Sequence, residues 1–172
     1  MKRKIILLLS FSFLLLGGYM MCSYYPPQSE KEIAQILGLD TADILSFYYA
    51  ESWTHKDYDI VEVYQLSEAT INDFIENSTF ILYDESYEKK AWGKTDWQRT
   101  PINMPDWDVI YSTAITPRRQ HSKHNEWMLQ VQRTLEELGN FCSFYYREGL
   151  SSVAIYVLDI NGHKLYCVYF KV

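Results

Sequence analysis

The sequence predicts an α+β protein in which an N-terminal membrane segment precedes one small domain with an antiparallel sheet packed against helices. Three observations lead to this prediction. One long apolar run occupies the start of the chain. The remainder mixes short amphipathic helical patterns with runs of β-branched and aromatic residues, and a turn signal joins the last two runs. We divide the chain into a signal or anchor segment (1–25), a linker (26–29) and a folded domain (30–172).

The first segment has the features of a membrane-inserting sequence. Lys2, Arg3 and Lys4 precede an apolar run from Ile5 to Cys22 that contains no charged residue. As a helix this run is about 27 Å long, at the short end of what spans the hydrocarbon layer. It resembles bacterial export signals, and its basic tip stays on the cytoplasmic side. We therefore expect the membrane to be contacted through residues 5–22 and the domain to be extracytoplasmic, in the cell envelope.

Cys22 leaves three outcomes open: a retained membrane anchor, a lipid attached to Cys22, or cleavage and release. The length of the apolar run and its flanks favour the anchor. A lipoprotein signal normally has a small residue just before the cysteine and an aliphatic residue three before it, where this chain has Met21 and Tyr19. Gly17 and Gly18 offer an ordinary cleavage point after Gly18.

The first part of the domain predicts a helix followed by two strands. Ser29 and Glu32 form a capping box at the start of this helix, and Gly38 can end it. Residues 43–53 and 58–66 are rich in aromatic and β-branched residues, which is typical of strands. A short polar segment between them predicts a turn.

The middle of the chain is less regular. Residues 67–77 predict a helix with a buried stripe of Ile71, Phe74 and Ile75. Short strands are expected at 79–84 and 106–113, on either side of an irregular region that contains glycine, prolines and tryptophans.

The last part predicts one long helix and three strands. The helix lies within 116–138, ends at Gly139, and places these residues at helical spacing: Trp127, Val131, Leu135 and Leu138. Strands follow at 140–148, 152–159 and 163–172. Asn161 and Gly162 predict a hairpin with a turn of two or three residues and a positive φ. We expect the helices to cover one face of the sheet and the tyrosine-rich opposite face to be partly exposed.

The charge of the domain restricts its partners. Three of the sixteen basic residues precede the apolar run and no acidic residue does, so the remainder carries 13 basic and 22 acidic side chains, a net charge of −9. Such a surface repels polyphosphate, which argues against nucleic-acid binding, and attracts a basic protein.

Tryptophans in and beside the irregular region are the candidate partner-binding residues: Trp92, Trp97 and Trp107. Exposed, they would be aromatic anchors of a protein interface or would stack on sugar rings. The alternative is that they fold back onto the sheet, because tryptophan is highly buried on average.

Residues 118–126 contain the one local basic cluster and two histidines. On a helix His121 and His124 share a face, and Asp106 or Asp108 could approach them, so a site of two histidines and a carboxylate is one interpretation. The basic neighbours would repel a metal ion, and we predict no metal or cofactor. Cys142 and Cys167 are expected to be buried thiols, with a disulfide as the alternative if their strands are neighbours.

These observations favour a membrane-tethered binding module of a bacterial envelope without enzymatic activity. A narrower form is an inhibitor or immunity-type protein for a basic partner, because an acidic surface speeds that encounter. One alternative is an envelope-polymer hydrolase that uses His121, His124 and Asp108. Another is a structural component of an envelope complex.

Overall fold

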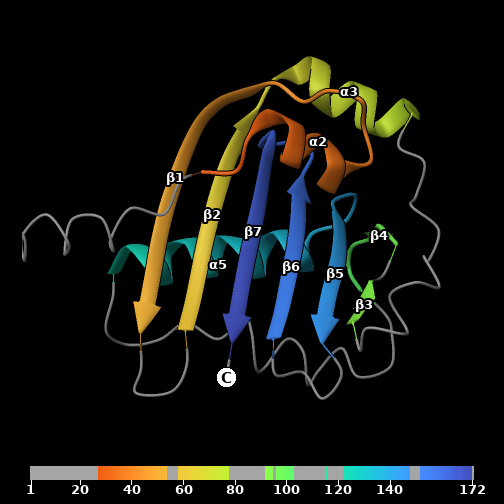
Figure 1. The fold of residues 1–172 in the computed structure, drawn as a ribbon. Coiled ribbons are helices and arrows are strands. Elements are labelled where there is room, and N and C mark those ends of the chain that lie inside the picture. Colours follow the sequence, from red (N-terminus) through yellow and green to blue (C-terminus); the bar gives the residue numbers. More distant parts are fainter. Residues whose placement is uncertain are drawn as a thin grey trace, which may run out of the picture.

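The computed structural model of the 172-residue chain describes residues 27–53, 58–77, 92–94, 96–102, 115, 122–147 and 152–171. In these residues the helices are α2 (Glu30–Leu37), α3 (Glu68–Asn77) and α5 (Ser122–Glu136). The strands are β1 (Ile44–Trp53), β2 (Tyr58–Leu66), β3 (Trp92–Lys94), β4 (Gln98–Arg99), β5 (Phe141–Arg147), β6 (Ser152–Asp159) and β7 (Lys164–Lys171). The predicted α+β domain is confirmed (Figure 1).

The strands form one antiparallel sheet in the order β1-β2-β7-β6-β5-β3. The sheet is six positions wide, because the short strands β3 and β4 both pair with β5 at its last position. The chain thus adds β1 and β2 at one side and returns through β5, β6 and β7, so that the C-terminal strand lies in the middle beside β2.

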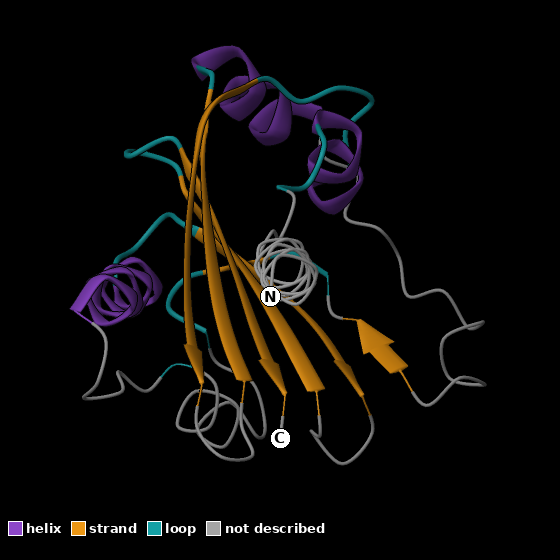
Figure 2. Ribbon diagram, turned by 60° about the vertical axis from the view of Figure 1, so that its left-hand side comes forward, coloured by secondary structure: helices purple, strands orange, loops and turns teal. Residues whose placement is uncertain are grey.

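Helices lie on both faces of this sheet, which corrects the expectation that they would cover one face only, while Tyr156 and Tyr169 on the tyrosine-bearing face are partly buried. Figure 2 shows α5 on one side and α2 and α3 on the other. Under α5 the core contains Met128, Val131 and Leu135 against Val61, Val63, Phe144, Ile155 and Val168. Under α2 and α3 it contains Ile33, Leu37, Ile71 and Phe74 against Tyr64, Leu66, Leu158 and Leu165. Two buried faces explain why several strands lack a simple apolar–polar alternation.

The short-range signals at α2 are confirmed in detail. The Ser29 hydroxyl accepts a hydrogen bond from the Glu32 backbone N–H at 3.3 Å, and the Glu32 carboxylate accepts one from the Ser29 N–H at 2.7 Å. Gly38 ends the helix in the left-handed conformation with φ of 74°. Each of these contacts joins residues close in sequence, which is why the sequence alone predicts them.

One residue of the predicted buried stripe of α3, and one residue that the prediction placed at helical spacing in α5, lie outside the core. Ile75 is 51% exposed, because α3 turns Thr70, Ile71 and Phe74 inward and the next residue points away. Leu138 is 82% exposed, because α5 ends at Glu136 and helical spacing no longer applies beyond it.

The predicted hairpin between β6 and β7 is present, but its turn differs from the prediction. Asp159 pairs with Lys164, so the loop has four residues. The positive φ in this loop is at His163, with a value of 51°. Gly162 is needed for a different reason: a Cβ there would lie 2.2 Å from Asp159 Oδ2, because the Asp159 carboxylate folds over the loop to accept the Gly162 N–H at 2.7 Å.

Cys142 and Cys167 are free and buried on opposite faces of the sheet. Cys142 lies in the core under α5, and Cys167 lies in the core under α2 and α3. Strand β6 separates their strands, so the disulfide alternative is not realised. Burial raises the pKa of both thiols well above the ordinary value.

Candidate functional site

A fully buried carboxylate, that of Glu62, lies on β2, on the sheet face that carries α2. Its neighbours Val61 and Val63 point into the opposite core, and alternation along β2 therefore places Glu62 on the same face as Tyr64. Glu62 Oε2 accepts hydrogen bonds from the Gln28 side-chain amide and from the Tyr64 hydroxyl, both at 3.0 Å. In the described part of the chain, no donor forms a hydrogen bond to Oε1.

Burial dominates the electrostatics of this carboxyl. Loss of hydration raises the pKa of Glu62 to about 7, against the opposing effect of the hydrogen bonds from Tyr64 and Gln28. Burial also raises the pKa values of Tyr64 and Tyr156. Near neutral pH, Glu62 thus exchanges a proton while its phenol neighbours keep theirs.

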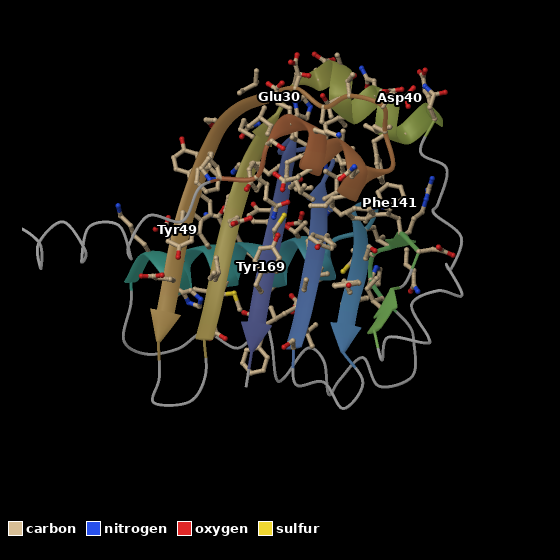
Figure 3. All side chains as sticks on the ribbon, in the orientation of Figure 1. Glu30, Asp40, Tyr49, Phe141 and Tyr169 are labelled. Atoms are coloured by element: carbon tan, nitrogen blue, oxygen red, sulfur yellow. The ribbon has the colours of Figure 1, made fainter. Side chains whose placement is uncertain are left out.

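Gln28 connects the carboxylate to two strands. Its backbone N–H donates to the Tyr64 hydroxyl at 2.8 Å, and its side-chain amide also donates to the Tyr169 hydroxyl. We call Gln28, Glu62, Tyr64 and Tyr169 the Glu62 cluster. Figure 3 shows Tyr169 on β7 and Tyr49 on β1 on the sheet face that also carries α2. The Tyr156 ring meets the Tyr169 ring edge-on at 6.4 Å and extends this aromatic surface.

A second feature is an open groove where the start of α2 meets the start of α3. Its volume is about 480 Å³, and it is lined by Glu30, Thr41, Ala42, Asp43, Ser67, Ala69, Thr70 and Asp73. We call it the acidic groove, because its lining includes three carboxylates and no basic side chain. The Asp43 backbone N–H donates to the Thr70 hydroxyl at 2.9 Å, which ties the segment before β1 to α3.

The predicted tryptophans occupy different positions. Trp97 is 5% exposed, donates its indole N–H to the Ile36 carbonyl at 3.2 Å, and meets the Phe74 ring edge-on at 5.3 Å. It therefore packs between α2 and α3. Trp92 lies in β3, but the structure does not describe its side chain. Trp107 lies entirely outside the described residues. Partner binding through Trp92 and Trp107 stays a prediction.

An exposed aromatic pair occurs elsewhere, where α5 crosses β1. Tyr48 is 52% exposed, and its ring lies 5.7 Å from that of the partly buried Trp127. The Lys164 ammonium lies 5.9 Å from the Trp127 ring centroid, within the range of a cation–π contact. The sequence analysis placed Trp127 at helical spacing in the long helix and gave no signal for this pair.

The histidine site of the hydrolase alternative is described only in part. His124 is buried on α5, whereas His121 and Asp108 lie outside the described residues. Among the residues that the structure does describe, no group of three histidine, cysteine or acidic side chains could hold a metal ion.

The predicted membrane segment and Cys22 also lie outside the described residues, which begin at position 27. Within the described ranges, every helix is too short or too polar to cross a bilayer.

Sequence reasoning missed the Glu62 cluster. A lone carboxylate between two valines in a strand was the available signal, because a charge in an apolar strand needs either solvent or partners. Nothing local could have identified Gln28 as a partner, since it is 34 residues from Glu62 and 141 from Tyr169. The sequence matches no protein-family model, and comparison with curated proteins and with solved structures gives no significant match.

Proposed function

We propose that the chain is a membrane-tethered binding module of a bacterial cell envelope that holds a basic partner protein at the acidic groove. The single observation that carries this proposal is the groove itself, with Glu30, Asp43 and Asp73 in its lining and no basic side chain. The net charge of −9 in the residues after the apolar run also favours a basic partner, because it attracts a cationic surface at long range, before the two proteins touch.

The groove suits basic side chains better than an apolar ligand. Its walls are carboxylates, hydroxyls and small residues, which would offer hydrogen-bond acceptors to lysine or arginine. The narrower form of the proposal is an inhibitor or immunity-type protein that occludes a basic toxin or hydrolase. The burial of His124 gives no support to the hydrolase alternative, so we put forward no second function.

The tether rests on the basic tip and the apolar run of residues 5–22. Intact mass of the protein recovered from membranes distinguishes the three outcomes at Cys22. A full-length mass indicates an anchor, a shortened mass with acyl chains indicates a lipoprotein, and a shortened mass without them indicates release. Full-length protein in the soluble cytosolic fraction would contradict the tether.

The groove is tested by photo-cross-linking in intact cells. A photoreactive residue is placed at the exposed groove positions Thr41 or Ala69, and in matched variants at the exposed α5 positions Glu126 or Arg133. We expect a defined protein adduct from the groove positions and little from α5. High salt should weaken recovery of the partner, because exposed charges are screened within about 10 Å at 0.1 M salt.

Charge neutralisation gives the decisive comparison. Asp43→Asn with Asp73→Asn keeps the shape of the groove and removes two charges, so we expect the adduct to fall several-fold. Glu126→Gln removes one charge on the opposite side and should leave the adduct in place. Equal adducts from both faces would instead indicate a structural component packed into a larger complex, and an adduct unaffected by the groove variants would refute the proposed site.

A further inference from the structure

Gln28 makes an unusual set of contacts for the residue that leads into a helix. It lies one position before the cap residue Ser29, yet it hydrogen-bonds to Glu62 and Tyr64 on β2 and to Tyr169 on β7. One side chain and one backbone N–H thus fasten the entry of α2 to two central strands. The segment that follows the apolar run is held against the sheet at this point.

The same contacts keep water from a carboxylate. Glu62 is fully buried, with Gln28 and Tyr64 as its hydrogen-bond donors on Oε2 and with Oε1 lacking a donor among the described residues. An ionised carboxylate prefers water to this environment, and a neutral one does not. Moving Gln28 away would let water reach Glu62. The ionisation of Glu62 and the opening of the Gln28–Glu62 contact are therefore linked.

Burial and the nearby Glu32 charge disfavour the ionised form of Glu62, and together they outweigh the hydrogen bonds from Tyr64, Gln28 and Tyr169, which favour it. Among the described residues, the titratable groups that face it are Tyr49 and Glu51 on β1, Tyr64 on β2, Tyr156 on β6, Cys167 and Tyr169 on β7, and Glu32 on α2. They are phenols, carboxylates and a thiol. The Glu32 charge adds to the cost of ionising Glu62. Ionisation is therefore unfavourable while the contact is closed.

We propose that Gln28, Glu62, Tyr64 and Tyr169 form a pH-sensitive latch that holds the entry of α2 on the sheet at acidic pH and opens more often as the pH rises to neutral. The fraction of molecules with an open latch increases as the pH rises from the pKa of the hydrated Glu62 carboxyl to that of the buried one. It levels off above about pH 7. The latch does not depend on the proposed binding function.

The native cysteines report this opening. Cys167 pairs with Glu62 across β2 and β7 and lies in the core beneath the latch, whereas Cys142 lies in the core on the opposite face under α5. Latch opening with α2 would expose Cys167 alone, while global unfolding exposes both. The experiment labels the full-length chain in detergent with 4,4′-dithiodipyridine from pH 5 to pH 8, and peptide mass mapping separates both sites from Cys22. Each rate is divided by the rate for the urea-unfolded chain at the same pH.

We expect Cys167 to react faster than Cys142, and its normalised rate to rise at least about tenfold from pH 5 to pH 7.5. Glu62→Gln should abolish that rise. Gln28→Ala should raise the Cys167 rate at pH 5 about tenfold, as loss of a hydrogen bond to a buried group implies. Tyr169→Phe is a milder variant that should act in the same direction if Gln28→Ala does not fold.

Gln130→Ala is the matched control. Gln130 on α5 accepts a hydrogen bond from the Tyr166 hydroxyl at 3.3 Å, which is a glutamine–tyrosine contact on the other face of the sheet. This variant should leave the Cys167 rate within about twofold of the wild type. Equal rates at both cysteines at every pH, or a pH-dependent Cys167 rate that persists in Glu62→Gln, would overturn the latch. So would a Cys167 rate that neither Gln28→Ala nor Tyr169→Phe changes.

Discussion

Replacing Glu62 with Gln would remove one ionisable group from the interior while keeping a side chain of nearly the same shape. In the unfolded chain the Glu62 carboxyl loses its proton near its ordinary pKa, whereas burial raises the pKa in the folded protein to about 7. Between these values the folded state binds more protons than the unfolded state. The free energy of unfolding therefore falls as the pH rises through this window, and Glu62 adds no further pH dependence below or above it.

The size of the effect follows from the shift. A pKa raised from 4.5 to about 7 corresponds to about 3 kcal/mol of lost stability once Glu62 is ionised. The Glu62→Gln variant has no such loss. Its amide nitrogen would replace Oε1, which lacks a hydrogen-bond donor in the described structure, so the variant carries a constant penalty at all pH values. The free-energy difference between variant and wild type should still change by about 3 kcal/mol in favour of the variant from pH 4 to pH 8.

Urea unfolding of the full-length chain, followed by tryptophan fluorescence and circular dichroism at several pH values, measures this difference. Glu51→Gln is the control, because it removes an exposed carboxylate from the same sheet face and keeps Glu62. It should preserve the wild-type pH dependence. A difference between Glu62→Gln and wild type that stays constant within about 0.5 kcal/mol over this range would refute the argument that burial controls Glu62.

Three further substitutions test the packing, each by thermal unfolding. Gly162→Ala should cost about 1–3 kcal/mol, because the new Cβ would displace the Asp159 carboxylate that accepts the Gly162 N–H. Trp97→Phe should cost about 2 kcal/mol, because it leaves a cavity and removes the N–H donor to the Ile36 carbonyl. Ser29→Ala should cost about 1 kcal/mol, because it removes the acceptor that caps α2.

Leu138→Gln is the common control for these three substitutions. Leu138 is 82% exposed, so the change should alter stability by less than about 0.5 kcal/mol. A Gly162→Ala variant as stable as this control would mean that the Asp159 carboxylate can leave the loop without cost. Wild-type stability in Trp97→Phe would contradict the role of Trp97 in joining α2 to α3.

Features that depend on neighbouring residues could be predicted from the sequence. The capping box of Ser29 and Glu32, the stop at Gly38 and the order of the principal strands all follow from contacts within a few positions or from composition along one strand. The hairpin at residues 160–163 was predicted for the same reason. The predicted loop length was wrong. Asp159, three positions before Gly162, organises a four-residue turn by accepting the Gly162 N–H.

Features that depend on how the layers meet could not be predicted. Trp97 was a candidate for an exposed anchor, and it is buried because it packs between α2 and α3. The helices were expected on one face of the sheet, and α5 lies on the face opposite α2 and α3. Periodicity identifies the apolar side of a helix. It does not say which face of the sheet that side will cover, or at which residue the helix ends and its contact with the core stops.

The sequence by itself determined the three described helices, the five long strands and their order, the lopsided charge and the apolar N-terminal run, because each is a local or summed property of the chain. Only the tertiary structure decided that Glu62 is buried under Gln28 and beside Tyr169, and that three carboxylates line one groove. Both arrangements join residues far apart in sequence. Their chemistry depends on desolvation, and only the packing of the sheet between its helices determines how much water each carboxylate retains.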